Sequence, residues 1–295
     1  MPKVIADRAK GGYLFRSSYD RGEDDVLAAI FLKSDPKDGP CYFFQESGTF
    51  RLVGLGTQWA IGLPGDKRNW QYAQENVVLM PPSNGRGLGK MIYFEAQGDG
   101  SGVVGADMSN VYHDGEVPIR AARHFAVDYS GKSGAKALVA IVDQLDGGGQ
   151  KTWVMHSGGR STSIEGDAFT ITGELPDTSL YGRIVIPEGI RLETGPFVWN
   201  QHNREFDKLQ KNPPSGGSKD VQHKQEEVPE RIDFPWGSET TLRAVAEGEQ
   251  VFFFFVMTLQ RGDPPEISVQ GKGLDARATI GDRVVRFVDG RLKIE

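Results

Sequence analysis

The sequence predicts an all-β protein, an antiparallel multi-strand β-sandwich of the super-sandwich kind with two or more stacked sheets. Among the 295 residues, 38 glycines and 16 prolines are scattered between short apolar runs, which favours many strands joined by turns over long helices. Some of these runs are almost continuously apolar, as in strands that are covered on both faces. With 38% hydrophobic residues, the chain can bury one large core or two modest ones.

One stretch, residues 41–61, anchors the interpretation of the N-terminal part. It begins as an aromatic block, continues through polar side chains and a Ser-Gly pair, and resumes as a strand with one apolar face. This pattern is typical of a bend between strands that presents Gln45 and Glu46 at a surface. The runs 12–20 and 26–33 are predicted as the two strands that hold the bend in place.

Further strands are predicted along the rest of the chain, from shorter apolar runs that are separated by turn signals. They span residues 75–80, 91–96, 102–108, 119–128, 136–143, 151–156 and, as a closing meander, 274–280, 283–288 and 291–294. The glycines at 147–149 predict a hairpin that makes the strands on either side antiparallel partners.

The run 250–257 contains four successive phenylalanines and predicts a deeply buried strand. Such a strand needs apolar cover on both faces, so another sheet or a partner must lie over it. Residues 206–232 are polar and aperiodic, which indicates an exposed excursion. We therefore expect a β-sandwich domain over 1–205, an exposed loop over 206–232, and strands over 233–295 that complete or extend the sandwich.

Charge and composition exclude several function classes. The net charge of −6 argues against general nucleic-acid binding, which needs a basic surface. Residues 1–100 carry 12 Lys+Arg and 12 Asp+Glu, so the remainder carries 34 − 12 = 22 against 40 − 12 = 28 and holds all of the acidic excess. An anionic ligand is therefore better tolerated by the first third of the chain.

Targeting, redox and nucleotide signals are equally sparse. Residues 1–8 contain no apolar signal-peptide core, and no stretch approaches the length of a membrane span, so neither export nor membrane insertion is expected from this chain. The single cysteine, Cys41, excludes an intrachain disulfide and a multi-cysteine zinc site. The glycine-rich run 84–90 lacks the Ser/Thr that follows the lysine of a phosphate loop, so we interpret it as a turn.

Several segments, taken in order, resemble a known family. They read "GYLFRSSYD", an apolar strand, "ESGTFRLVGLGTQWA", "ENVVLM", "HFAVDYSGKSGAKALVAIVDQLDGG" and "TWVMH". Their order and spacing are similar to the β-sheet region of heparinase II/III-type polysaccharide lyases. The resemblance covers residues 10–160 most clearly and extends more weakly over the rest.

The resemblance implies a β-rich C-terminal region that, in complete members, packs against an N-terminal α/α toroid. The glycan cleft lies between the two, and uronic-acid-containing chains are cleaved by β-elimination. That reaction needs a neutralised carboxylate, a base and an acid, and members commonly use His and Tyr for the last two. Family members are usually periplasmic or secreted; the location of this chain itself is left open.

This chain departs from the family pattern at the positions of the metal and the base. A family His-x-His-x-Asp segment is replaced here by Tyr42, Phe44 and Glu46, and two further metal positions correspond to Gly62 and Glu75. Phenylalanine and glycine offer no donor side chain, so no cofactor is predicted and the usual metal site is lost or rebuilt. A magnesium or calcium ion between Glu46 and Glu75 remains conceivable.

The catalytic candidates are Tyr42 and His113. By the resemblance, Tyr42 can serve as a lyase-type base or acid, but it can equally be a packing residue of the aromatic block. His113 lies beside a turn and can be a proton donor or a structural histidine.

The substrate-binding candidates are Arg16, Gln45, Glu46, Arg51 and Glu75. Arg16 can neutralise a uronate carboxylate through a bidentate pair, or it can pair with Asp20 or another local acid. Gln45 and Glu46 can bind sugar hydroxyls or form a solvated bend.

Two functions follow. The first is a lyase-related β domain that forms one wall of an acidic-polysaccharide cleft, inactive or incomplete unless a toroid is supplied in trans; if active, it is a carbon–oxygen lyase acting on polysaccharides. The second is a non-catalytic carbohydrate-binding or scaffolding β-sandwich. The replaced histidines favour the second, and the resemblance favours the first. Homodimerisation through the aromatic-rich N-terminal face is a further hypothesis on partners.

Overall fold

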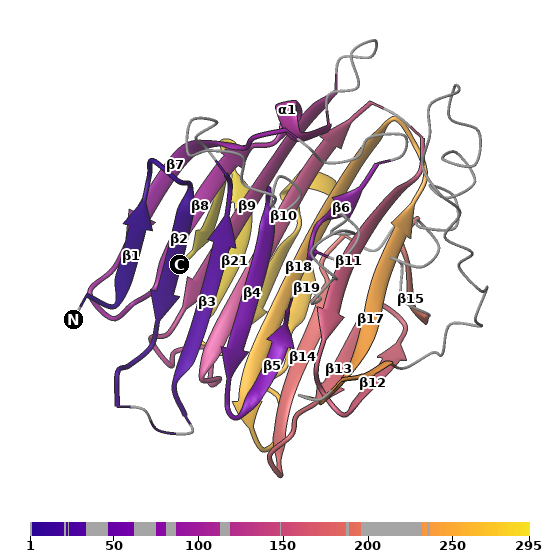
Figure 1. Cartoon of the computed structure of the whole chain (residues 1–295). Coiled ribbons are helices and arrows are strands. Elements are labelled where there is room, and N and C mark those ends of the chain that lie inside the picture. Colours follow the sequence, from indigo (N-terminus) through magenta and orange to yellow (C-terminus); the bar gives the residue numbers. More distant parts are fainter. Residues whose placement is uncertain are drawn as a thin grey trace, which may run out of the picture.

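The structure is a computed structural model that describes residues 2–20, 22, 24–33, 47–61, 75–80, 87–112, 119–147, 149–186, 189–195, 232–234 and 237–295. These residues form four antiparallel sheets and one short α-helix, α1 (Ser109–Tyr112), so the predicted all-β class is confirmed (Figure 1). Within the same residues, no helix has the length and apolarity that a membrane crossing requires.

The first sheet has its strands in sequence order. It contains β1 (Val4–Asp7), β2 (Gly12–Arg16), β3 (Val26–Phe31), β4 (Thr49–Gly54) and β5 (Thr57–Ala60). The predicted strands before and after the anchor stretch are β2, β3 and β4, with Phe50 and Leu52 on one buried face. β3 lies in the middle of the sheet, as its apolar run predicts.

The largest sheet has eight strands in the order β12-β13-β14-β18-β10-β9-β8-β7. The strands are β7 (Lys90–Ala96), β8 (Gly102–Asp107), β9 (Arg120–Asp128), β10 (Ala137–Asp146), β12 (Ser161–Glu165), β13 (Ala168–Thr172), β14 (Thr178–Ile184) and β18 (Gln250–Arg261). β18 therefore lies between strands that precede it by many residues in the sequence.

Two smaller sheets complete the fold. One has the order β15-β17-β11-β6, with β16 also paired to β17, and contains β6 (Val78–Leu79), β11 (Lys151–Ser157), β15 (Arg191–Gly195), β16 (Ile232–Phe234) and β17 (Gly237–Ala246). The other is a meander of β19 (Ser268–Gln270), β20 (Arg277–Ile280), β21 (Arg283–Val288) and β22 (Arg291–Ile294), with the 3₁₀ helix η2 (Gly273–Asp275) before β20. The predicted C-terminal meander is confirmed.

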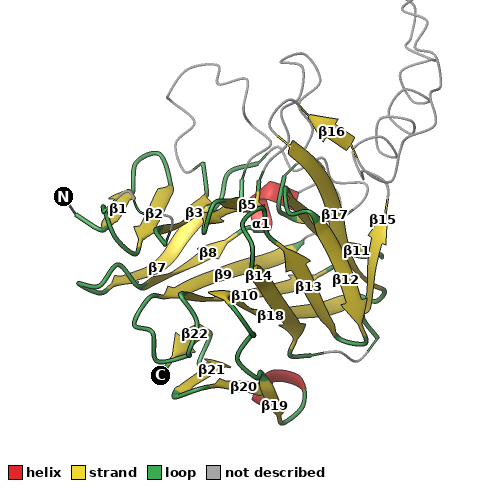
Figure 2. Cartoon of the chain, turned by 90° about the horizontal axis from the view of Figure 1, so that it is seen from below, coloured by secondary structure: helices red, strands yellow, loops and turns green. Residues whose placement is uncertain are grey.

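The sheets stack in three layers. β5 and β11 are joined by hydrogen bonds from Ile61 N to His156 O (3.0 Å) and from Gly158 N to Gln58 O (2.9 Å), so their two sheets form one continuous layer. The eight-stranded sheet lies beneath this layer, and the C-terminal meander covers part of its other face (Figure 2).

Each interface between layers contains its own hydrophobic core. Phe253 and Phe255 point into the core between the first two layers, whereas Phe254 points into the core beneath the meander. Side chains alternate between the faces of a strand, so consecutive phenylalanines enter different cores. The expectation that both faces of this run are covered is confirmed.

The predicted hairpin around residues 147–149 is wrong. β10 pairs with β9 and β18, while β11 pairs with β6 and β17, so the two strands belong to different sheets. Glycine turns suit a hairpin, but they equally allow the chain to cross from one layer to the next. Both edges of β10 are occupied by other strands, which leaves β11 no place beside it.

Candidate functional site

The structure describes three of the seven predicted site residues. Arg16, Arg51 and Glu75 lie within it, whereas Tyr42, Gln45, Glu46 and His113 lie outside the described residues. The role of those four therefore remains a prediction. The excursion at 206–232 also lies outside, except for Ile232 in β16.

Arg16 lies at the end of β2 and forms an ion pair with Asp25. Its Nε donates to Asp25 Oδ2 (2.8 Å), and its guanidinium lies 4.5 Å from the ring centre of Tyr19. This is the local-acid alternative, with Asp25 rather than Asp20 as the partner. β3 separates Arg16 from the residues described next.

Arg51 and Glu75 lie together, on β4 and just before β6. Arg51 Nη2 donates to Glu75 Oε2 (2.5 Å), and the Thr49 hydroxyl donates to the same oxygen (2.8 Å). Arg51 Nη1 is also within hydrogen-bond distance of Thr49 Oγ1 (2.5 Å). The Glu75 carboxylate is only 6% exposed, so this cation and this hydroxyl compensate its burial.

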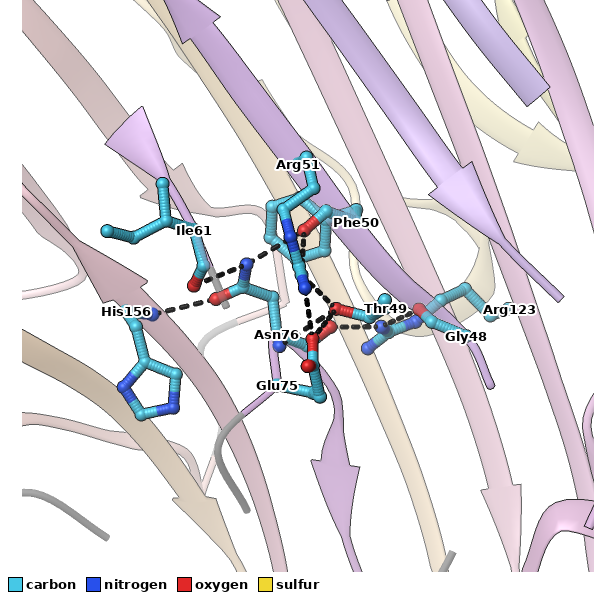
Figure 3. A network of polar contacts seen from close by, with 9 residues as sticks. All are labelled: Gly48, Thr49, Phe50, Arg51, Ile61, Glu75, Asn76, Arg123 and His156. Carbon is cyan, nitrogen blue, oxygen red and sulfur yellow. Dashed lines mark hydrogen bonds and ion pairs between the residues drawn. The ribbon is translucent and has the colours of Figure 1, made fainter. Parts of the chain in front are cut away.

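Asn76 connects three parts of the upper layer. Its Nδ2 donates to Phe50 O (2.7 Å) and Ile61 O (3.1 Å), and its Oδ1 accepts from His156 N (2.8 Å) (Figure 3). Its backbone N donates to Thr49 Oγ1 (3.1 Å). A single amide side chain thus fixes β4, the end of β5 and β11 relative to one another.

Arg123 connects the eight-stranded sheet to this network. It lies on β9, directly opposite Asp143 on β10, and binds both carboxylate oxygens through Nε (2.6 Å) and Nη2 (2.8 Å). Its Nη1 donates to Gly48 O (2.6 Å) and Asn76 O (2.8 Å). With both side chains 3% exposed, the pair is a buried bidentate bridge whose remaining donors are also used.

His156 borders the network on the side of β17. Its side chain is fully buried, and Nδ1 lies 3.0 Å from Thr241 Oγ1. We refer to Thr49, Arg51, Glu75, Asn76, Arg123, Asp143 and His156 as the polar network. Most of its members were not predicted as site residues.

The sequence contains only weak signals for the residues of the polar network that were not predicted. Asn76 follows the predicted residue Glu75, and His156 ends the "TWVMH" segment, so both lay within recognised segments. Arg123 lies next to His124 in a strand that begins with Arg120, and these polar side chains suggest solvent exposure. Only its position opposite Asp143 shows why an arginine is buried there.

The network offers charge and hydrogen-bond donors. Among the residues that the structure describes, no three His, Cys, Asp or Glu side chains gather as a metal site. Glu75 is already engaged by Arg51 and Thr49, while Glu46, its proposed partner for a cation, lies outside the described residues. Of the two arginines, Arg51 keeps 22% of its side chain exposed and Arg123 keeps 3%.

Comparison with known proteins identifies the fold. No family model matches the chain, and no curated protein matches it in sequence. Among solved structures, a heparinase III matches 99% of this chain with a TM-score of 0.62 and 13% identity. The heparan sulfate lyase HepC from Pedobacter heparinus also matches 99% of it, with a TM-score of 0.62 and 12% identity.

The match covers only part of each lyase chain. This chain spans 42% of the length of each of these two lyases. The fold implied by the sequence resemblance is therefore confirmed at the level of architecture. The chain has the fold of a β-sheet region that these heparinase III and heparan sulfate lyase structures contain as part of a longer chain.

Proposed function

We propose that this chain is a lyase-related β domain that binds acidic polysaccharide and needs a second, complementary domain for β-elimination. The fold it shares with part of two heparan-degrading lyases supports the substrate class. The observation that carries the proposal is the partly exposed guanidinium of Arg51, which is bound to the Glu75 carboxylate within the polar network.

The contact between Arg51 and the Glu75 carboxylate is of the same kind as the contact that would bind a uronate carboxylate. Arginine binds carboxylates through a planar fork, and neutralising the uronate carboxylate is the first requirement of β-elimination. In this structure, Glu75 occupies part of the fork, so a glycan carboxylate must share or displace it. Glu75 then tunes the affinity for the glycan rather than contributing to it directly.

The test measures glycan binding and bond cleavage separately. The chain is titrated with heparan sulfate, chondroitin sulfate and alginate, and each mixture is followed for the absorbance of unsaturated uronate. We expect binding that weakens with salt, no product from this chain alone, tighter binding by Glu75→Gln and weaker binding by Arg51→Gln. Arg160→Gln removes an exposed, ion-paired arginine elsewhere and is the control for net charge.

Other outcomes have defined meanings. If Arg51→Gln and Arg160→Gln weaken binding equally, Arg51 has no specific part and the site assignment fails. Product from this chain alone that disappears in Tyr42→Phe would show a complete catalyst and refute the need for a second domain.

The second candidate is a scaffolding β-sandwich without glycan binding. It is favoured by the mutual pairing of Arg51, Glu75 and Thr49, which a purely structural cluster also requires. Absence of binding to all three polysaccharides, with Arg51→Gln lowering only the melting temperature, would select it over the first.

A further inference from the structure

A groove of about 500 Å³ lies on the opposite side of the eight-stranded sheet from the polar network. It runs between β22 and the outer face of β7 to β9. Small residues contribute to its lining, among them Ala96, Gly102 and Ala126. At one end, the ion pair of Arg291 with Glu95 (2.9 Å) links β22 to β7.

The backbone of β22 presents hydrogen-bonding groups to this groove. Among the described residues, β22 is the edge strand of the meander and pairs with β21 only. Val284 and Glu295 exchange both backbone hydrogen bonds (2.9 Å each), so the alternate residues Leu292 and Ile294 direct their N–H and C=O groups away from β21. Leu292 N donates to the Tyr93 hydroxyl (2.9 Å).

The meander is too narrow to cover the large sheet. β22 contacts β9 and, less extensively, β8, while β7 forms the edge of the large sheet beyond them. In Figure 2 the meander lies beneath the large sheet, and β22 is its strand on the side toward β8 and β7. One additional strand beside β22 would cover the groove lining.

We propose that the groove binds a single extended peptide segment that adds to the edge of β22. Leu292 O, Ile294 N and Ile294 O would pair with the peptide backbone, as in β-strand addition, and the small lining residues would accommodate its side chains. The occupant is a segment without a sheet of its own, because β7 and β8 already fill the space beneath the added strand. This excludes the edge strand of a second copy that is backed by its own large sheet.

The test is selection of linear peptides from a phage-displayed library on the full 295-residue chain, with removal of binders to Ile294→Pro. Proline at 294 removes an N–H that faces the groove and leaves the bonds of Lys293 and Glu295 to β21 in place. We expect enriched peptides that bind the Ile294→Pro variant at least tenfold more weakly than the wild-type chain. When bound to the wild-type chain, these peptides should slow amide exchange at Ile294. Arg277→Ala, in β20 and outside the groove lining, keeps every backbone group and should change the affinity less than threefold.

Two further variants make the outcome decisive. Ala96→Trp fills the groove while the backbone edge remains, so it should also abolish binding. In an extended peptide, every second amide N–H faces β22. Of the two sets of peptides that are N-methylated on alternate amides, only the set that blocks the N–H groups facing β22 should lose binding. The proposal is overturned if no peptide distinguishes the wild-type chain from both Ile294→Pro and Ala96→Trp, or if exchange at Ile294 is unchanged by bound peptide.

Discussion

At the scale of single residues, buried polar side chains decide where the layers join. Arg123 is an example, because its guanidinium binds Asp143 in its own sheet and two carbonyls of the layer above. A guanidinium that loses its carboxylate in such a place keeps its charge without compensation. The bridge therefore positions the network more than it adds to net stability.

Removing one partner of this bridge should be costly. We expect Asp143→Ala to lower the free energy of unfolding by about 3–5 kcal/mol, because Arg123 stays buried and charged. The double variant Arg123→Met/Asp143→Leu should recover much of this loss but remain below wild type, since Gly48 O and Asn76 O lose their donor. Urea unfolding of the three variants tests the order, and a double variant no more stable than Asp143→Ala would contradict it.

His124 is a second residue whose environment differs from its sequence pattern. Its position beside Arg123 in the sequence suggests the polar face of a strand, yet it is buried between the rings of Tyr93 and Phe287. Burial lowers its pKa from 6.5 to about 4, and the polar side chain of Gln144 opposes the shift only in part. The Tyr93 hydroxyl accepts from Leu292 N and lies 2.9 Å from Nδ1, a contact that a neutral ring can make in either tautomer.

The lowered pKa predicts a loss of stability in acid. Between pH 6.5 and 4 the unfolded chain binds a proton at this histidine that the folded chain does not, so stability falls as the pH falls. The contribution at neutral pH is about 3 kcal/mol and is lost progressively across that window. Unfolding of wild type and His124→Phe should be compared at several pH values, and equal slopes for both proteins would refute the assignment.

At the scale of elements, cross-strand partners explain glycines that occur inside strands. Gly182 of β14 lies directly opposite Phe169 of β13, and the phenylalanine ring occupies the space where a Cβ would be. The sequence shows only a glycine between a tyrosine and an arginine. The aromatic partner gives the reason for it.

Substitution of this glycine should disturb the pair. Gly182→Ala forces the Phe169 ring to move and should lower the free energy of unfolding by about 1–3 kcal/mol, as overpacking does. Gly149→Ala is the matched control, because nothing lies within 4 Å of its added Cβ. Thermal unfolding of both variants measures the difference; equal melting temperatures would show that Phe169 adapts without cost.

At the scale of the whole molecule, two cores share one central sheet. Phe254 and Phe255 are neighbours in β18 but point into different cores. Each is fully buried, so truncation of either leaves a cavity. Each truncation should therefore destabilise the outer layer on its own side of the central sheet.

The two truncations should lower the free energy of unfolding by similar amounts but loosen different layers. Phe254→Ala and Phe255→Ala should each lower the free energy of unfolding by about 3–5 kcal/mol. Hydrogen exchange should accelerate in β20 to β22 for Phe254→Ala, and in β4 and β11 for Phe255→Ala. The same exchange pattern in both variants would mean that the layers open as one unit.

The sequence by itself determined the local features. Turn-forming residues and apolar runs predicted the β class, most strand positions, the C-terminal meander and the two-sided cover of the phenylalanine run. These depend on side-chain period and turn chemistry, which act over a few residues. Arg51 and Glu75 were likewise proposed from their segments.

Only the tertiary structure decided which strands pair and which polar residues meet. β18 enters between β14 and β10, so the hairpin expected from the glycines at 147–149 does not form. Arg123 reaches Gly48 and Asn76 across 75 and 47 residues of sequence, and β22 is the edge of the meander among the described strands. Such contacts depend on the folding of the entire chain, because local preferences do not specify which distant strand fills each edge of a sheet.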